Sequence, residues 1–283
     1  MEKRVAKILE RLKLGDDHIY TSKFISTEQE DEIKLRETVA SVVYDDYLVE
    51  VANHHSIPVM DKEVQLFYNL IPSNGIIIDV GGCWGWHWRG LMKQRPDVIV
   101  FVVDFIRANL KHAINVIGNM INKNIFLIHG DATQLPFPDY SFDGYWSVQT
   151  LQHIPDYLKA IQEAYRVLRV PGYFVNYSLK NNKIISLIYR LCRKQYHTKG
   201  KISGSYYLAR ASKEQEKIVA QVFQNQIVCR YTELLFQPDL RIQPGGKHSL
   251  LGRIDSYLSS NVHVFSYIAR QCSFHTTKLG EKN

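Results

Sequence analysis

The sequence predicts an α/β protein in which helices cover both faces of a doubly wound, mostly parallel, Rossmann-like sheet. Short apolar segments alternate with helical segments of about ten residues or more, which is the pattern of repeated βαβ units. The first apolar segment also ends in a glycine-rich turn. Because βαβ crossovers are right-handed and bring strands together in parallel, we expect three αβα layers. We expect seven strands, with the last strand antiparallel.

Five continuous apolar segments are predicted to be central strands, because a strand buried on both faces lacks polar alternation. They are residues 76–80, 98–103, 125–128, 142–147 and 173–177. Helices are predicted over 107–119 and 157–169, with Asp156 as the N-cap of the second and Pro171-Gly172 as its stop. Residues 226–236 and 261–270 are rich in β-branched and aromatic residues and are predicted to be the closing strands.

Two regions depart from this rhythm of strands and helices. Residues 1–60 are charged and helix-prone, and we expect them to form an N-terminal helical cap. Residues 179–211 are basic and contain tyrosines, and we expect them to be a lid-like insertion in the domain formed by 61–283. Both are predicted to lie over the carboxyl edge of the sheet, where open α/β sheets bind their ligands.

Composition limits the class of protein but does not indicate its chemistry. The 283 residues are 45% hydrophobic and 22% charged, with a formal net charge of +7, as in an ordinary globular chain. No apolar run reaches the roughly 20 residues of a membrane span, and no secretory signal follows Met1, so we expect a cytoplasmic protein. The four cysteines and eleven histidines lack the spacing of metal ligands, so no metal site is predicted.

The most informative segment is the turn Asp79-Val80-Gly81-Gly82-Cys83-Trp84-Gly85-Trp86. A dinucleotide fingerprint that starts at Gly81 needs glycines at positions 83 and 86 but meets Cys83 and Trp86. The pattern D-x-G-x-G-x-G matches at Asp79, Gly81 and Gly85 and departs at Cys83 alone. An acid at the strand end repels a pyrophosphate and suits an ammonium group. The turn therefore favours a cofactor with a methionine tail over one with phosphates.

The region from about 60 to 178 resembles a class I S-adenosylmethionine-dependent methyltransferase of the type 11, ubiquinone/menaquinone-biosynthesis-like family. The motifs that carry the resemblance follow one another in order: 79–85, 102–104, 130–137, and 141–156 with 163–172. This sequence departs from the family pattern at Cys83, where a glycine is expected, and at Val170, which is inserted before Pro171-Gly172.

The resemblance implies S-adenosyl-L-methionine as cofactor and assigns it a set of binding residues. Asp79, Gly81 and Gly85 would hold the methionine part, and Asp104 would accept hydrogen bonds from the ribose. Phe105 would lie against the adenine, and Asp131 and Ala132 would bind its edge. Ser147 and Val148 would line the methionine and the sulfonium. Asp143, at a strand start, is predicted to be structural.

The acceptor is predicted from weaker signals. His153 is the candidate general base, because imidazole titrates near neutrality and this residue follows the fourth strand. Gln149, Gln152, Asn176 and Tyr177 follow or end strands four and five and are candidate substrate residues. Trp84, Trp86 and Trp88 alternate, so they cannot share one helical face; one or two are expected in the core and Trp84 or Trp86 beside a ligand.

The function predicted on these grounds is methyl transfer to a small-molecule or lipid-like acceptor. An RNA methyltransferase and a non-catalytic member of the fold remain alternatives. DNA is not an expected partner, and no oligomeric state is predicted. Residues 183–201 combine aliphatic and basic side chains, which is typical either of a lid helix packed on its own domain or of weak contact with an anionic membrane.

Overall fold

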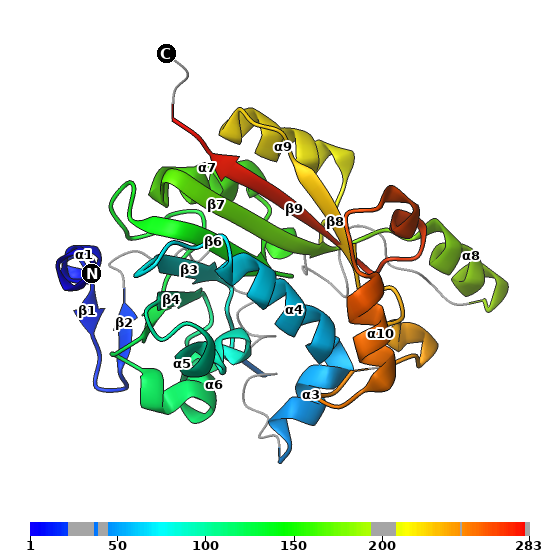
Figure 1. Cartoon of the computed structure of the whole chain (residues 1–283), viewed down its shortest axis with the longest axis horizontal. Helices are drawn as coiled ribbons and strands as arrows, with labels where there is room; N and C mark the ends of the chain where they lie inside the picture. Colours follow the sequence, from blue (N-terminus) through cyan, green and yellow to red (C-terminus); the bar gives the residue numbers. More distant parts are fainter. Residues whose placement is uncertain (22–36, 39–44, 194–207, 244, 281–283) are drawn as a thin grey trace.

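The computed structural model describes residues 1–21, 37–38, 45–193, 208–243 and 245–280. Figure 1 shows one twisted sheet with helices packed on both faces, which confirms the predicted α/β class. The strand order is β1-β2-β5-β4-β3-β6-β7-β9-β8. The central strands are all parallel: β3 (Ile76–Val80), β4 (Ile99–Asp104), β5 (Ile125–His129), β6 (Phe142–Val148) and β7 (Leu168–Leu179).

The carboxyl-terminal strands confirm one expectation and correct another. Strand β9 (Gln271–Lys278) is antiparallel to both β7 and β8 (Val228–Thr232), as predicted for the last strand. The strand predicted over 261–270 is wrong, because His263–Tyr267 forms the 3-10 helix η5 and the strand begins only at Gln271. Val262 and Val264 are exposed, so their alternation is not that of a half-buried strand.

Two further strands lie in the region that was predicted to be a helical cap. β1 (Lys13–Leu14) and β2 (Ile19–Thr21) extend the sheet from seven to nine strands, with β2 parallel to β5. Ile19, fully buried, lies opposite Leu127 of β5. Strands of two and three residues are too short to show a periodic pattern, so the sequence carried no signal for them.

The helices form the two outer layers (Figure 1). On one face lie α7 (Tyr157–Val167) and α9 (Lys213–Phe223); on the other lie α4 (Ile57–Tyr68), α5 (Leu91–Gln94) and α6 (Arg107–Ile117). α10 (Leu250–Leu258) packs against α4. The remaining helices are α1 (Glu2–Leu9), α3 (Tyr47–His54), α8 (Lys183–Leu191) and the 3-10 helices η1 (Trp86–Trp88), η2 (Gly118–Met120), η3 (Leu151–His153) and η4 (Pro238–Leu240).

The helix at 157–169 begins as predicted but ends earlier. Asp156 Oδ1 accepts a hydrogen bond of 3.1 Å from the backbone N–H of Lys159, which confirms the predicted N-cap. The helix stops at Val167, and β7 begins directly at Leu168. Pro171 and Gly172 therefore lie within a strand and are not the helix stop, which corrects that expectation.

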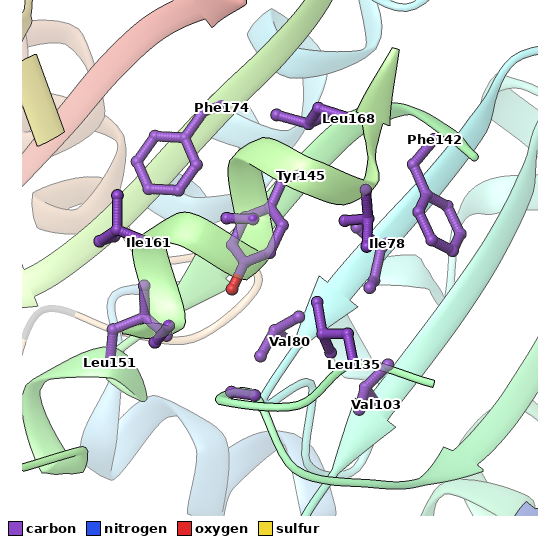
Figure 2. Close-up of a cluster of buried hydrophobic side chains, with 14 of the residues drawn as sticks. Ile78, Val80, Val103, Leu135, Phe142, Tyr145, Leu151, Ile161, Leu168 and Phe174 are labelled. Atoms are coloured by element: carbon purple, nitrogen blue, oxygen red, sulfur yellow. The ribbon is translucent and has the colours of Figure 1, made fainter. Parts of the chain in front are cut away.

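The sheet buries apolar side chains on both faces, which gives the molecule two cores. In β3 the side chains of Ile76, Ile78 and Val80 join one cluster and that of Ile77 joins the other. Figure 2 shows the first cluster, where Tyr145 and Phe174 of neighbouring strands face Ile161 of α7. These segments are continuous apolar runs in the sequence because a central strand is buried on both faces. No described helix combines the length and the apolar character that crossing a membrane requires.

Candidate functional site at the carboxyl edge of the sheet

A cavity of about 840 Å³ opens where the central parallel strands end. Strand order reverses at β3, which lies between β4 and β6, and such a switch point leaves a crevice at the carboxyl ends of the strands. The cofactor side of the cavity is lined by Val80, Gly81, Cys83, Val103, Asp104, Phe105, Ile106, Asn109, Gly130, Asp131, Ala132, Thr133 and Val148. The opposite side is lined by Tyr47, Glu50, Val51, His54, His55, Trp84, Trp86, Gln149, Thr150, Gln152, His153, Ile154, Pro155, Asp156, Lys159, Leu179, Leu208, Arg210 and Arg270.

The glycine turn approaches its neighbours too closely to allow side chains. Gly81 has a φ of +73°, and a Cβ there would lie 1.9 Å from Oγ1 of Thr150. A Cβ on Gly82 would lie 2.4 Å from Oδ2 of Asp79. Cys83, the departure from the family pattern, has a φ of +50°, in the left-handed region that glycine favours. The structure thus gives a conformational reason for the pattern that Cys83 breaks.

Asp79 lies beneath this turn and outside the cavity lining. Its side chain is buried, and Oδ2 accepts a hydrogen bond of 2.6 Å from the indole Nε1 of Trp88. Burial raises the pKa of Asp79 to about 7; the Trp88 hydrogen bond opposes this shift and the charge of Asp104 adds to it. The carboxylate therefore sits behind Gly82, from where its charge can act on the turn.

Asp104 lines the cavity and organises the turn at the same time. Its Oδ2 accepts a hydrogen bond of 2.9 Å from the backbone N–H of Cys83. Its Oδ1 accepts bonds from the backbone N–H of Ile106 at 2.8 Å and from Nδ2 of Asn109 at 3.2 Å. This carboxylate ties the end of β4 to the glycine turn of β3, so it positions the cavity wall whatever else it binds.

The remaining cofactor-side residues meet at the ends of β4, β5 and β6. Phe105, Asp131, Ala132 and Val148 all line the cavity. Oδ1 of Asp131 accepts hydrogen bonds from the backbone N–H and the hydroxyl of Thr133, at 2.7 and 2.8 Å. No described residue donates to Oδ2 of Asp131, which leaves one carboxylate oxygen for a ligand.

Besides Asp79, two more predicted cofactor residues do not line the cavity. Gly85 has a φ of +67° and lies against the side chain of Ile117. The hydroxyl of Ser147 is fully buried and donates a hydrogen bond of 2.9 Å to the backbone carbonyl of Val80. Both support the strand ends from behind. Asp143 is likewise buried away from the cavity, accepting bonds from the Ile76 N–H, Arg4 and Arg169.

The structure separates the predicted acceptor residues into two groups. His153, Gln149 and Gln152 line the cavity, and Nε2 of Gln152 lies 3.1 Å from Nε2 of His153. Asn176 and Tyr177 are fully buried outside the lining. The amide of Asn176 donates to the hydroxyl of Tyr157 at 3.3 Å, and the hydroxyl of Tyr177 donates to Oε2 of Glu63 at 2.8 Å.

The tryptophans divide in a similar way. Trp84 and Trp86 both line the cavity, and Trp88 is buried in the core. The ring centroid of Trp84 lies 5.1 Å from that of Tyr47, and Nε1 of Trp84 donates to Asn109 at 3.3 Å. These two indoles add aromatic surface to the cavity, and Asn109 links Trp84 to Asp104.

Helix α3 supplies acceptor-side residues that the sequence did not single out. Tyr47, Glu50, Val51, His54 and His55 come from residues 47–55 and line the cavity. Burial lowers the pKa of His55 to about 3, and the neighbouring charge of Arg270 acts in the same direction. The sequence shows the His54-His55 pair, but only the packing of α3 over the sheet edge shows that it borders the cavity.

Two arginines from the carboxyl-terminal half also reach the acceptor side. Arg210 and Arg270 line the cavity, and Nη1 of Arg270 forms an ion pair of 2.5 Å with Oε2 of Glu233. Glu233 is fully buried and also accepts a bond of 3.3 Å from the backbone N–H of Ser56. The buried carboxylate holds Arg270 at the junction between the start of β9 and the helices α3 and α4.

The cofactor side has the chemistry that a methionine-tailed nucleoside needs. Its residues at 80–83, 103–106 and 130–133 include two carboxylates and no cationic side chain, which disfavours the phosphates of a dinucleotide. The open Oδ2 of Asp131 can accept from an amine or hydroxyl, and the space over Gly81 admits close approach by a ligand. These residues fit S-adenosylmethionine.

Comparisons of the sequence with known proteins agree with this geometry. The family model described as "Methyltransferase domain" matches residues 78–176. A 2-methyl-6-phytyl-1,4-hydroquinone methyltransferase of Oryza sativa subsp. japonica is 35% identical over 101 residues, 34% of this chain and 27% of that protein. A demethylmenaquinone methyltransferase of Listeria welshimeri is 37% identical over 87 residues, 30% of this chain and 37% of that protein. The match thus spans well under two thirds of either relative's length.

The fold is shared with solved methyltransferases. A structure described as a SAM-dependent methyltransferase from Thermotoga maritima superposes with a TM-score of 0.53 at 18% identity, covering 81% of this chain and 92% of that one. This likeness extends the shared fold well beyond the segment that the family model matches. Residues 78–176, with the glycine turn and the acidic cavity wall that they contribute, match the methyltransferase-domain family model, and the fold around them is that of a solved SAM-dependent methyltransferase.

Proposed function

We propose that the protein transfers a methyl group from S-adenosylmethionine to a small-molecule, lipid-like acceptor. The observation that supports this best is one cavity with two different walls. The lining at the ends of β3, β4 and β5 is acidic and cation-free, whereas the rest, which includes α3, 149–156 and the arginines, is aromatic and of mixed charge. A cavity of about 840 Å³ is large enough for two ligands of small-molecule size side by side.

When bound, the cofactor supplies a methyl group already activated by its sulfonium. The tasks left to the protein are binding, alignment of the acceptor with the methyl carbon and exclusion of water. Asp104 and Asp131 would bind the nucleoside, and the turn at Gly81 would admit the methionine tail. Val148 ends β6 and lines the cavity, where it would line the methyl group.

The acceptor wall supports an aromatic, partly apolar substrate. Trp84 and Trp86 offer ring faces for stacking, and Val51 and Leu208 add aliphatic surface. The relatives named above act, by their names, on a phytyl-hydroquinone and on demethylmenaquinone. An acceptor of that kind, a hydroxylated ring with an apolar chain, is our proposed substrate class.

His153 is the proposed general base for an acceptor that must lose a proton. It lines the cavity directly after the end of β6, and the Gln152 amide beside it can orient the imidazole. A candidate general base is judged first by its geometry, and His153 meets this requirement because it lines the cavity. Asn176 and Tyr177 are buried, which gives their proposed substrate role less support.

The other function classes receive less support. An RNA methyltransferase gains nothing from the relatives, whose printed names are those of small-molecule enzymes. A non-catalytic member of the fold has no need for Asp79, Asp104 and Asp131 together. The cytoplasmic location and the weak contact of residues 183–201 with an anionic membrane stay proposals; residues 194–201 of that stretch lie outside the described residues.

Calorimetry with S-adenosylhomocysteine tests the proposal. We expect the wild type to bind it, and Asp104→Ala and Asp131→Ala each to weaken binding at least about tenfold, since each loses charge-assisted hydrogen bonds. Asp16→Ala, at an exposed aspartate outside the cavity, is the matched control and should bind as the wild type does. Absence of binding at millimolar ligand, with Asp104→Ala indistinguishable from the wild type, would falsify the methyltransferase proposal.

Transfer of a radiolabelled methyl group to a panel of hydroquinones tests the acceptor class. Labelling of prenylated hydroquinones, with their unprenylated analogues labelled more slowly, is the expected outcome. Labelling of RNA alone would overturn the acceptor proposal while leaving the cofactor proposal intact.

A further inference from the structure

Three segments near the cavity carry eleven of the 23 large hydrophobic side chains that are exposed among the described residues. The segments are α8, α10 and the stretch from 262 to 268 that contains η5. Their exposed apolar residues, called the apolar face below, are Ile184, Leu187, Leu191, Leu250, Leu251, Ile254, Tyr257, Val262, Val264, Tyr267 and Ile268. Single exposed apolar residues are ordinary, whereas a contiguous group marks an interaction surface.

Helix α8 is apolar on two sides, and the fold uses one of them. Ile185 and Tyr189 are buried at a spacing of four residues, so this side packs on the domain. Ile184, Leu187 and Leu191 follow the i, i+3, i+7 spacing of a second stripe, and Leu191 is 74% exposed. The second stripe contributes nothing to the described core.

Helix α10 repeats this arrangement. Gly252 and Asp255 are buried on the side that packs toward the domain. Leu250, Ile254 and Tyr257 form the exposed stripe, at the i, i+4, i+7 spacing, and Tyr257 is 84% exposed. A large aromatic residue with most of its surface in water is costly unless a partner covers it.

Hydrogen bonds join the start of α8 to η5 and the chain after α10 to the sheet. Nζ of Lys180, just before α8, donates to the carbonyl of Ser266 in η5 at 2.6 Å. The backbone of Ser260, between α10 and η5, pairs with Tyr231 of β8. Figure 1 shows the result at one edge of the molecule, where α10, the dark orange turn of η5 and α8 follow one another. The three segments therefore lie at the same end of the fold.

The charges around the apolar face are of one sign. Exposed basic residues on or beside the three segments are Lys183, Arg190, Arg193, Lys247 and Arg253. Between residues 180 and 193 and between 245 and 270 the one acidic residue is Asp255, which is fully buried. A surface that is aliphatic, aromatic and cationic matches the interface of an anionic bilayer.

The apolar face also adjoins the cavity. Leu179 lines the cavity four residues before α8 begins, and Arg270 lines it three residues after η5 ends. An apolar molecule that leaves a bilayer at this face would therefore meet the acceptor side of the cavity first.

We propose that the apolar face docks on an anionic lipid bilayer and places the cavity beside it. Docking is a property of the surface alone; its use in delivering an acceptor rests on the proposed function. A second copy of the chain is a poorer occupant, because an isologous contact would bring the same unneutralised cations together. Nucleic acid would use the cations but leave the aliphatic stripes in water.

Co-sedimentation of the full chain with vesicles tests this proposal. One set of vesicles is phosphatidylcholine, and the other is an equal mixture of phosphatidylcholine and phosphatidylglycerol. We expect sedimentation with the mixed vesicles at low salt and a decline as salt is added. Replacing Lys183, Arg190 and Arg253 together by glutamine should lower the partition coefficient about 100-fold, at about fivefold for each cation.

Matched variants distinguish binding through the apolar face from non-specific effects of charge and hydrophobicity. Lys93, Lys111 and Lys123, exposed on other parts of the surface, replaced together by glutamine, should leave binding within about twofold of the wild type, beyond the Debye length of the docked face. Leu187→Glu with Tyr257→Glu should abolish binding, whereas Met92→Glu, at an exposed apolar residue of α5, should not.

Three outcomes would overturn the proposal. The first is no sedimentation with either kind of vesicle. The second is an equal loss of vesicle binding in the two triple variants. The third is a loss of vesicle binding that sedimentation velocity traces to dimerisation of the chain through this face. Calorimetry with S-adenosylhomocysteine on the same preparations keeps the two proposals apart, since intact cofactor binding without vesicle binding removes the docking surface alone.

Discussion

The indole Nε1 of Trp88 donates a hydrogen bond of 2.6 Å to Oδ2 of Asp79 beneath the glycine turn. This bond joins the last residue of η1 to the strand that ends in the turn, and it fixes the carboxylate against Gly82. The aspartate of the D-x-G-x-G-x-G motif is thus held by a core tryptophan. The carboxylate of Asp79 lies behind the cavity wall.

Asp79→Asn should show separately how much the buried charge of Asp79 lowers the stability of the fold and how much it contributes to cofactor binding. The pKa of Asp79 is raised in the folded state, from 3.8 to about 7, so its contribution to stability is present below about pH 4 and is lost as the pH rises through 7. The asparagine keeps an acceptor for Trp88 without the charge. We expect urea unfolding at pH 8 to show a gain of up to about 4 kcal/mol over the wild type, with little gain at pH 4.

The same substitution should weaken the binding of S-adenosylhomocysteine, because the charge of Asp79 behind the turn attracts the ammonium group of the ligand. We expect about tenfold weaker binding by calorimetry, equivalent to roughly 1.4 kcal/mol. Asp16→Asn is the exposed control for both measurements. A variant that is less stable at pH 8 than the wild type would contradict the raised pKa.

Gly81→Ala should disable the cofactor wall by two separable effects. The new Cβ would lie 1.9 Å from the Thr150 hydroxyl, and alanine at a φ of +73° is strained by about 1 kcal/mol. We expect S-adenosylhomocysteine binding to fall at least about 30-fold, beyond the roughly fivefold that backbone strain of that size alone explains.

The double variant Gly81→Ala with Thr150→Ala isolates the steric part. Thr150→Ala removes the contacts of 1.9 and 2.2 Å with the hydroxyl and methyl but leaves the Thr150 Cβ at 2.4 Å and the backbone strain, so binding should recover only in part. Thr150→Ala alone should bind nearly as the wild type does. Additive losses in the double variant would show that the predicted contact does not limit the turn.

His153→Ala should leave cofactor binding intact while lowering turnover. General base catalysis contributes about 100-fold to 10,000-fold, so we expect kcat to fall by at least about 100-fold with a hydroquinone acceptor. The affinity for S-adenosylhomocysteine should change less than twofold, because His153 lies on the acceptor side. Unchanged turnover from pH 6 to 9 would remove His153 from the mechanism.

Asp143→Ala should destabilise the fold without touching the site. Asp143 accepts bonds of 2.7 Å from the Ile76 N–H, 2.8 Å from Arg4 and 3.1 Å from Arg169. The arginines can rehydrate, but the buried N–H of Ile76 loses its partner, so we expect a loss of about 2 kcal/mol in urea unfolding. S-adenosylhomocysteine affinity should stay constant, and a change in it would contradict the structural role.

Much of the cofactor side could be predicted from the sequence. Gly81, Asp104, Phe105, Asp131, Ala132 and Val148 were all placed from the motif order, and all line one cavity. This succeeded because each of them ends a parallel strand or follows one within three residues, and parallel strands end at the same edge of the sheet. Gly85 and Ser147 were placed at that edge too, but their packing directs them behind it.

The sequence by itself determined the α/β class, the positions of the central strands along the chain and the acidic cofactor wall, since these follow from local apolar runs and short motifs. Only the tertiary structure decided that α3 and Arg270, separated by more than two hundred residues, form one acceptor wall, and that Tyr177 turns away to Glu63. The strands β1 and β2 and the apolar face over α8, α10 and η5 belong to the same category. The physical reason is that contacts between distant segments depend on how helices pack over the sheet, which no local period records.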